Sequence, residues 1–209
     1  NSFSVAKATL IISGFPKLKG ETLLEKRSSS KNDFDHIRKA LMWEPRGHAD
    51  MYGAIIVEPD PAGADFGVIF IHNEGYSTGC GHAVLALTKA FIETGLIKKI
   101  EPITQVSMDV PSGFIRSFAE VENNEIANIG FQNVPSFVQE MDLIVDVPNF
   151  GNICYDLAFG GAYYAFVDIS QFNLDCTQEY YDKLIKIGMI IKNLILKSAI
   201  MDHPTIPEM

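Results

Sequence analysis

The chain has 209 residues, of which 47% are hydrophobic and 21% charged, a composition typical of a globular core rather than of a disordered chain. Its 26 acidic and 17 basic residues give a formal net charge of -9, and Lys and Arg form no run that could follow a phosphate backbone. We therefore expect no nucleic-acid partner.

The first two thirds of the chain alternate short apolar runs with turn residues, as strands of a largely antiparallel sheet do. A first helix, over residues 33–42, is amphipathic, with Phe34 and Ile37 on one face and Asp35 and Arg38 on the other. These elements predict the α+β class. The predicted strands cover residues 5–13, 54–57, 67–72, 105–109, 114–121 and 126–132.

A second helix, predicted over residues 81–94, differs in kind. It is apolar on nearly all sides, and Gly95 follows it as a C-terminal stop. Because such a helix must be covered on most sides, we expect the sheet to curve around it.

A domain boundary is predicted near residue 150, with a first unit over residues 1–150 and a second over residues 151–209. In the second unit a Gly-Gly pair precedes a β-prone run at residues 163–167. Little sequence follows the last predicted helix, so we expect the second unit to be incomplete.

That third helix is predicted over residues 176–199, with Asp175 and Gln178 at capping-box spacing. Its apolar face holds Leu184, Ile187, Ile191 and Leu194. Lysines interrupt the apolar run, which is too short for the roughly 20 residues that span a bilayer. We therefore expect no membrane partner.

Three cysteines, Cys80, Cys154 and Cys176, are too few and too far apart for a disulfide framework or a CxxC metal site. No signal-peptide pattern is visible at the first residues, and we expect a reducing, cytoplasmic setting. Cys154 and Cys176 are interpreted as small buried hydrophobes.

The segment of residues 70–82 runs from a predicted strand through small residues into the enclosed helix. Cys80, Gly81 and His82 stand where unpaired backbone N–H groups and the positive end of the helix dipole attract an anion. That field lowers a thiol's pKa toward neutrality, and the N–H groups can hold a carboxylate. We interpret Cys80 as a candidate base for removing an α-proton, with no cofactor required.

Other polar residues are weaker candidates. His82 could hold or deprotonate an amine of the substrate, and Arg46 and His48 gather in one loop as supporting residues. His72 lies in a predicted strand and is interpreted as structural. Because no two histidines show a spacing such as HExxH, no metal site is expected.

Two stretches resemble the proline racemase family, and within it the trans-3-hydroxy-L-proline dehydratase branch. They are residues 41–54, LMWEPRGHADMYGA, and residues 72–84, HNEGYSTGCGHAV. The resemblance implies a diaminopimelate epimerase-like fold of two halves, each with a curved sheet around a central helix. It also implies that Cys80 abstracts the proton and that Gly81 and His82 bind the substrate.

The implied reaction is a cofactor-independent dehydration of trans-3-hydroxy-L-proline to a cyclic imine, with a small imino acid as the partner; a homodimer is left open. The Asp-Arg-Ser-Pro motif of the family's second half is not in this sequence, so we expect a truncated chain of little or no activity. A two-base proline racemase or hydroxyproline epimerase is the alternative enzyme. A non-catalytic paralogue that acts as a binding module is the alternative of another class.

Overall fold

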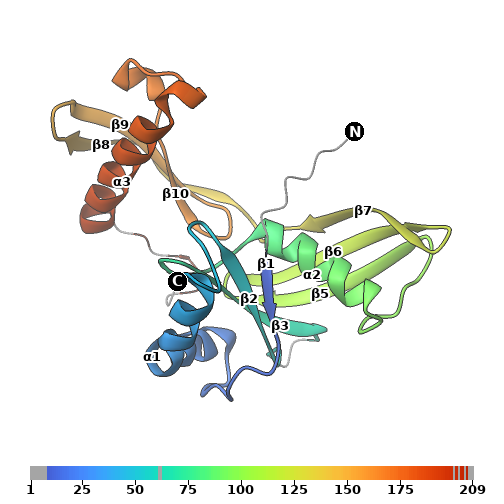
Figure 1. Ribbon diagram of the computed structural model, residues 1–209. Helices are drawn as coiled ribbons and strands as arrows, with labels where there is room; N and C mark the ends of the chain where they lie inside the picture. Colours follow the sequence, from blue (N-terminus) through green and yellow to red (C-terminus); the bar gives the residue numbers. More distant parts are fainter. Residues whose placement is uncertain (1–8, 61–62, 200, 202, 205, 207–209) are drawn as a thin grey trace. The chain divides into compact units, whose positions relative to one another are not determined.

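A computed structural model describes residues 9–60, 63–199, 201, 203, 204 and 206 of the chain (Figure 1). Its contacts divide into two compact units, one up to Val134 and one from Pro135 onward. The predicted boundary near residue 150 falls instead in the turn between two paired strands of the second unit. Their pairing joins residues 137–147 to residues 151–159, so the chain cannot divide there.

The first unit is built on one mixed sheet and two helices. Its strands are β1 (Thr9–Ile12), β2 (Tyr52–Val57), β3 (Phe66–His72), β4 (Gly75–Ser77), β5 (Ile103–Val110), β6 (Gly113–Glu122) and β7 (Glu125–Gln132). They lie in the order β1-β2-β3-β5-β6-β7, and β4 pairs with β3. The β1–β2 and β3–β5 pairs are parallel and the others antiparallel, so the prediction of a largely antiparallel sheet is confirmed.

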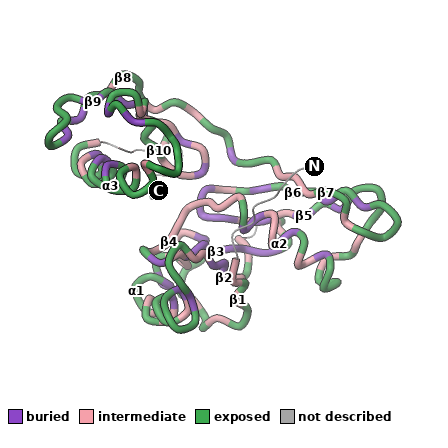
Figure 2. The backbone as a smooth tube through the Cα atoms, turned by 45° about the horizontal axis from the view of Figure 1, so that its top comes forward, coloured by how far each residue is buried: buried purple, intermediate pink, exposed green. Residues whose placement is uncertain are grey.

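Two helices cover opposite faces of this sheet: α1 (Leu23–Met42) and α2 (Gly81–Glu93). Alternate residues of a strand point to opposite faces. In β3, Ile69 and Ile71 pack with residues of α1, whereas the Phe66 ring stacks on Phe91 of α2 at a centroid distance of 4.1 Å. The strand is therefore apolar on both sides and buried along almost its whole length (Figure 2).

The sheet curves around α2. This helix contacts β1 and β2 near one end of the strand order and β6 and β7 at the other end, which a flat sheet could not provide. Its buried residues are Ala83, Val84, Leu87, Thr88 and Ile92. Fully burying one aliphatic side chain such as Leu87 contributes about 1.5–3 kcal/mol. The predictions of helix 81–94 and of an enclosing sheet are confirmed, with Gly95 following at φ 75°.

The first helix begins ten residues earlier than predicted. Thr22 and Glu25 form a complete capping box: the Thr22 hydroxyl accepts from the Glu25 amide, and the Glu25 carboxylate accepts from the Thr22 amide. The serines that follow lower helix propensity, and Phe34 has non-helical backbone angles that divide α1. These features remove the apolar periodicity by which the first half of the helix could have been predicted.

The second unit is a three-stranded antiparallel sheet with one long helix. Within the sheet the strands lie in the order β10 (Tyr163–Phe166), β9 (Gly151–Phe159), β8 (Phe137–Val147). Along the chain, β10 is followed by two short 3₁₀ helices, η1 (Ile169–Phe172) and η2 (Gln178–Tyr180), and then by α3 (Tyr181–Ser198). One sheet face packs on the predicted apolar face of α3 through residues such as Tyr155, Leu157 and Ile191. Val138, Ile144, Tyr164 and Phe166 on these strands are exposed.

The second unit differs from the predictions in its helix start, in the exposure of two cysteines and in one strand that was not predicted. The helix begins at Tyr181 and not at residue 176, because residues 178–180 form η2, and no cap forms between Asp175 and Gln178. Cys154 and Cys176 are exposed rather than buried. Strand β8 was not predicted, because irregular pairing between Val138 and Leu143 breaks its period of two. Predicted strand residues 5–8 lie outside the described residues.

Candidate active site

Cys80 is the N-cap residue of α2, as predicted. Its backbone is extended, at φ -155° and ψ 98°, and its carbonyl accepts the hydrogen bond from the Val84 amide at 3.1 Å. The side chain makes no capping hydrogen bond, and the first turn contains no acidic residue. The positive end of the α2 dipole therefore meets no acidic side chain in its own first turn. His82, in the same turn, is exposed.

The start of α2 lies against β7 of the same unit. A Cβ atom added to Gly81 would stand 3.1 Å from Cζ of Phe131, so a glycine here lets the aromatic ring lie directly against the first turn. Sequence reasoning did not identify Phe131 as a neighbour of Cys80. About fifty residues separate the two, and only the curvature of the sheet brings them together.

The loop before Cys80 is held by polar contacts with its backbone. The Ser77 hydroxyl donates to the Gly79 carbonyl at 2.8 Å, and the Ser112 amide donates to the Thr78 carbonyl at 3.0 Å. Ser112 is buried in the turn between β5 and β6, and among the described residues its hydroxyl has no hydrogen-bond partner. The loop is thus fixed from β4 on one side and from the β5–β6 turn on the other.

Arg46 and His48 lie exposed in the loop between α1 and β2. The His48 ring donates from Nδ1 to the adjacent Ala49 carbonyl at 2.7 Å. Among the ion pairs of the described residues, none includes Arg46. The loop is therefore not organised by its own charges. Besides backbone hydrogen bonds of its own, it is held by hydrogen bonds with the turn between β3 and β4.

Asn73, which sequence reasoning missed, organises that loop from the turn between β3 and β4. The side chain is 7% exposed. Its Oδ1 accepts from the Met51 amide at 2.9 Å, and its Nδ2 donates to the carbonyls of Met42 at 2.6 Å and His48 at 2.9 Å. An asparagine two residues before a glycine is an ordinary turn signal, so the sequence did not indicate that this side chain holds a distant loop.

Gly47→Ala should lower the free energy of unfolding by at least about 2 kcal/mol, because a Cβ atom there would overlap the Met42 carbonyl group and lie 2.6 Å from the Leu41 oxygen. Urea unfolding at neutral pH measures the change. Gly160→Ala is the matched control, since nothing lies within 4 Å of the added atom. Equal effects of the two substitutions would contradict the close packing of this loop.

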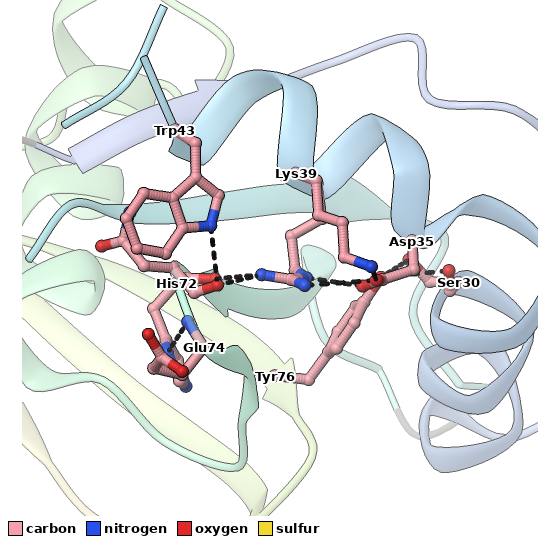
Figure 3. A network of polar contacts seen from close by, with 9 residues as sticks. Ser30, Asp35, Lys39, Trp43, His72, Glu74 and Tyr76 are labelled. Atoms are coloured by element: carbon pink, nitrogen blue, oxygen red, sulfur yellow. Dashed lines mark hydrogen bonds and ion pairs between the residues drawn. The ribbon is translucent and has the colours of Figure 1, made fainter. Parts of the chain in front are cut away.

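A buried polar network joins α1 to the β3–β4 hairpin that leads to Cys80 (Figure 3). Arg38 is at its centre. The side chain is 5% exposed, pairs with Asp35 through Nε at 2.6 Å, and donates from Nη1 to the carbonyls of His72, at 2.8 Å, and Asn73. The sequence pattern placed Arg38 on the solvent face. That was wrong, because Arg38 lies one turn before the fully buried Met42, on the face of α1 that packs against the sheet and its hairpin.

The same network sets the ionisation of its members. The hydrogen bond from Arg38, with a smaller contribution from Lys39, holds the pKa of Asp35 below its usual value. Burial raises the pKa of Tyr76, so its phenol stays protonated at neutral pH and donates to the Ser30 carbonyl at 3.0 Å. Trp43 adds a bond from its indole nitrogen to the Asn73 carbonyl at 3.2 Å.

The described residues contain no group of three or more His, Cys, Asp or Glu side chains that could hold a metal ion. His72 is half-buried beside Tyr52, at a ring-centroid distance of 5.3 Å, and its Nδ1 accepts from the Glu74 amide. Within the same residues, no helix is both long enough and apolar enough to cross a bilayer.

Comparison with known proteins gives consistent matches over almost the whole chain. The family described as proline racemase matches residues 6–209. A trans-3-hydroxy-L-proline dehydratase of Colwellia psychrerythraea is 48% identical over 200 residues, which are 96% of this chain and 56% of that protein. A 3-hydroxyproline 2-epimerase of Burkholderia multivorans is 44% identical over 199 residues, 95% of this chain and 59% of that protein.

A solved structure agrees in fold. The crystal structure of a hydroxyproline epimerase from Agrobacterium vitis, with bound trans-4-hydroxy-L-proline, superposes with a TM-score of 0.90 at 28% identity. The match covers 97% of this chain and 60% of that one. The chain thus spans less than two thirds of the length of the relatives that it matches.

Proposed function

The chain belongs to the proline racemase family, and on that premise we propose that it serves the cofactor-independent dehydration of trans-3-hydroxy-L-proline, with Cys80 as the base. One observation carries the proposal: Cys80 is the N-cap residue of α2, where its carbonyl accepts from the Val84 amide and its thiol lies at the start of the helix. A thiolate in that position lies beside N–H donors that can hold the substrate's carboxylate.

The chemistry follows from this arrangement. The Cys80 thiolate takes the proton from the α-carbon, and the electron pair left behind is stabilised as an enolate-like charge by the same N–H groups that hold the carboxylate. The electrons then form a carbon–carbon double bond as the 3-hydroxyl leaves. The proton that Cys80 took from the α-carbon is given to the departing hydroxyl, which leaves as water and restores the thiolate. The resulting enamine tautomerises to the cyclic imine, so the net reaction is the loss of one water molecule.

Gly81 and His82 are proposed to bind the substrate. Gly81 contributes its backbone at the first turn of α2 and allows Phe131 to lie against it. His82 is exposed in that turn, where its imidazole can meet the substrate's amine. Arg46 and His48 remain proposed supporting residues, held in their loop by Asn73.

Dehydration is favoured over epimerisation by the 48% identity to a named dehydratase, against 44% for a named 3-hydroxyproline epimerase. Both reactions begin with removal of the α-proton, and they differ in the second step, which is loss of the hydroxyl or return of a proton. Binding of an imino acid without any reaction is the third outcome, expected of a non-catalytic module. We expect slow turnover from the 209-residue chain.

The test is to incubate the chain with trans-3-hydroxy-L-proline in D₂O and to follow the substrate by proton NMR. Appearance of the cyclic imine supports the proposal. Deuterium at the α-carbon with retention of the hydroxyl would contradict dehydration and indicate epimerisation as the reaction of this chain. Substrate binding, detected by saturation transfer, without exchange or product would favour the binding module, and no binding at all would overturn the proposed substrate.

A further inference from the structure

The strand that leads to Cys80 has little support from the sheet itself. β4 contains three residues and pairs only with β3 among the described strands, joining Tyr76 to Ile71 and Ser77 to Phe70. Ser77 is also the residue whose hydroxyl holds the Gly79 carbonyl. Any movement of β4 is therefore passed directly to the loop that places the thiol.

The missing support for β4 comes from α1, through a single tyrosine. The Tyr76 hydroxyl donates to the Ser30 carbonyl at 3.0 Å and accepts from the Ser30 hydroxyl at 3.3 Å. The Tyr76 backbone carbonyl accepts from Nη2 of Arg27 at 3.0 Å. The guanidinium of Arg38 lies 5.8 Å from the centre of the phenol ring. Three residues of α1 therefore fix one residue of β4 by its hydroxyl, its backbone and its ring. Figure 3 shows the Tyr76 side chain directed toward Ser30.

These contacts have the character of a rigid support rather than of a surface contact. Ser30 is fully buried and Arg38 nearly so. Buried hydrogen bonds hold their geometry because water cannot replace a lost partner. The effect of a helix N-terminus on a neighbouring anion falls off within the first turn, so a small displacement of Cys80 changes the stabilisation of its thiolate.

We propose that Tyr76 is a positioning residue for Cys80: anchored to Ser30 and Arg27 of α1, it holds β4 and the following loop so that the thiol stays at the N-terminus of α2. The inference rests on the proposed function of Cys80 as a base. It adds that α1, on the opposite face of the sheet from α2, determines the reactivity of the site.

The experiment measures the rate at which iodoacetamide alkylates Cys80 between about pH 5 and pH 10, a range that brackets the ordinary pKa of a thiol. Peptide mass spectrometry reads each cysteine separately. Cys154 and Cys176, exposed in the second unit, serve as internal references. In Tyr76→Phe, which removes one hydroxyl and keeps the ring, the pH profile of Cys80 should move to higher pH. The rate at neutral pH should fall about three- to tenfold, with the references unchanged.

Two further variants make the result decisive. Arg27→Gln removes the donor to the Tyr76 carbonyl and should move the profile in the same direction. Thr22→Ala weakens α1 at its N-cap, away from β4, and should lower the melting temperature while leaving the profile in place. An unmoved profile in Tyr76→Phe, or an equal shift in Thr22→Ala, would overturn the positioning role. A wild-type Cys80 that reacts like the two references would instead contradict the proposed base.

Discussion

Cys80→Ser is expected to slow α-proton removal from trans-3-hydroxy-L-proline by about 10²–10⁴-fold, the usual contribution of a general base. The serine hydroxyl cannot ionise at neutral pH, so the base is lost although the side chain keeps nearly the same shape. The substitution should not harm the fold. Cys80 makes no capping bond in the native protein, and serine is among the preferred N-cap residues.

The expected signature is therefore a loss of activity together with unchanged or slightly higher stability, by up to about 1 kcal/mol if the serine caps α2. Proton NMR of the substrate gives the rate, and thermal unfolding gives the stability. Cys176→Ser, at an exposed cysteine in the second unit, is the matched control and should change neither. Retained activity in Cys80→Ser would remove Cys80 from the role of base.

Arg38→Met should destabilise the protein by about 2–4 kcal/mol at neutral pH. Methionine replaces the aliphatic part of the buried side chain, so the loss comes from the polar network. The substitution removes one of the two ion-pair partners of Asp35 and the donor to the carbonyls of His72 and Asn73. Trp43 still donates to the Asn73 carbonyl, which keeps the effect below that of a completely unpaired site.

The pH dependence of this difference follows from Asp35. Its pKa in the folded protein is lowered, first by the hydrogen bond from Arg38, so its ionised form contributes stability above the unfolded pKa of about 3.9. That contribution is lost as the pH falls through the lower folded value. The gap between wild type and Arg38→Met should therefore be full at neutral pH and narrow below about pH 4.

Chemical unfolding at neutral pH and at acidic pH measures the gap. Lys39→Met is the matched control because Lys39 contacts the same carboxylate at 3.1 Å while its side chain is 65% exposed. An exposed pair of this kind contributes less than about 1 kcal/mol. Equal destabilisation by the two substitutions would show that the burial of Arg38 has no special weight.

Much of the first unit was predictable because its signals are local. Apolar runs bounded by turn residues located six of its strands, and a helix apolar on nearly all sides required an enclosing sheet, which the contacts of α2 with β1 and β7 confirm. Prediction was wrong where the hydrophobic pattern is interrupted. In the first unit the serines and the break at Phe34 left the first half of α1 unpredicted, and in the second unit the irregular pairing of β8 left that strand unpredicted.

The position of Cys80 at the start of α2 was settled by the sequence, because small residues followed by an apolar helix form a local pattern that needs no distant partner. Its surroundings were decided by the tertiary structure. Phe131, Ser112 and Tyr76 come to this region from separate strands and turns. The roles of Arg38 and Asn73 depend on burial, which long-range packing creates. A charge in a helix has the same local sequence signature whether it faces water or a hairpin, and only the folded chain distinguishes the two.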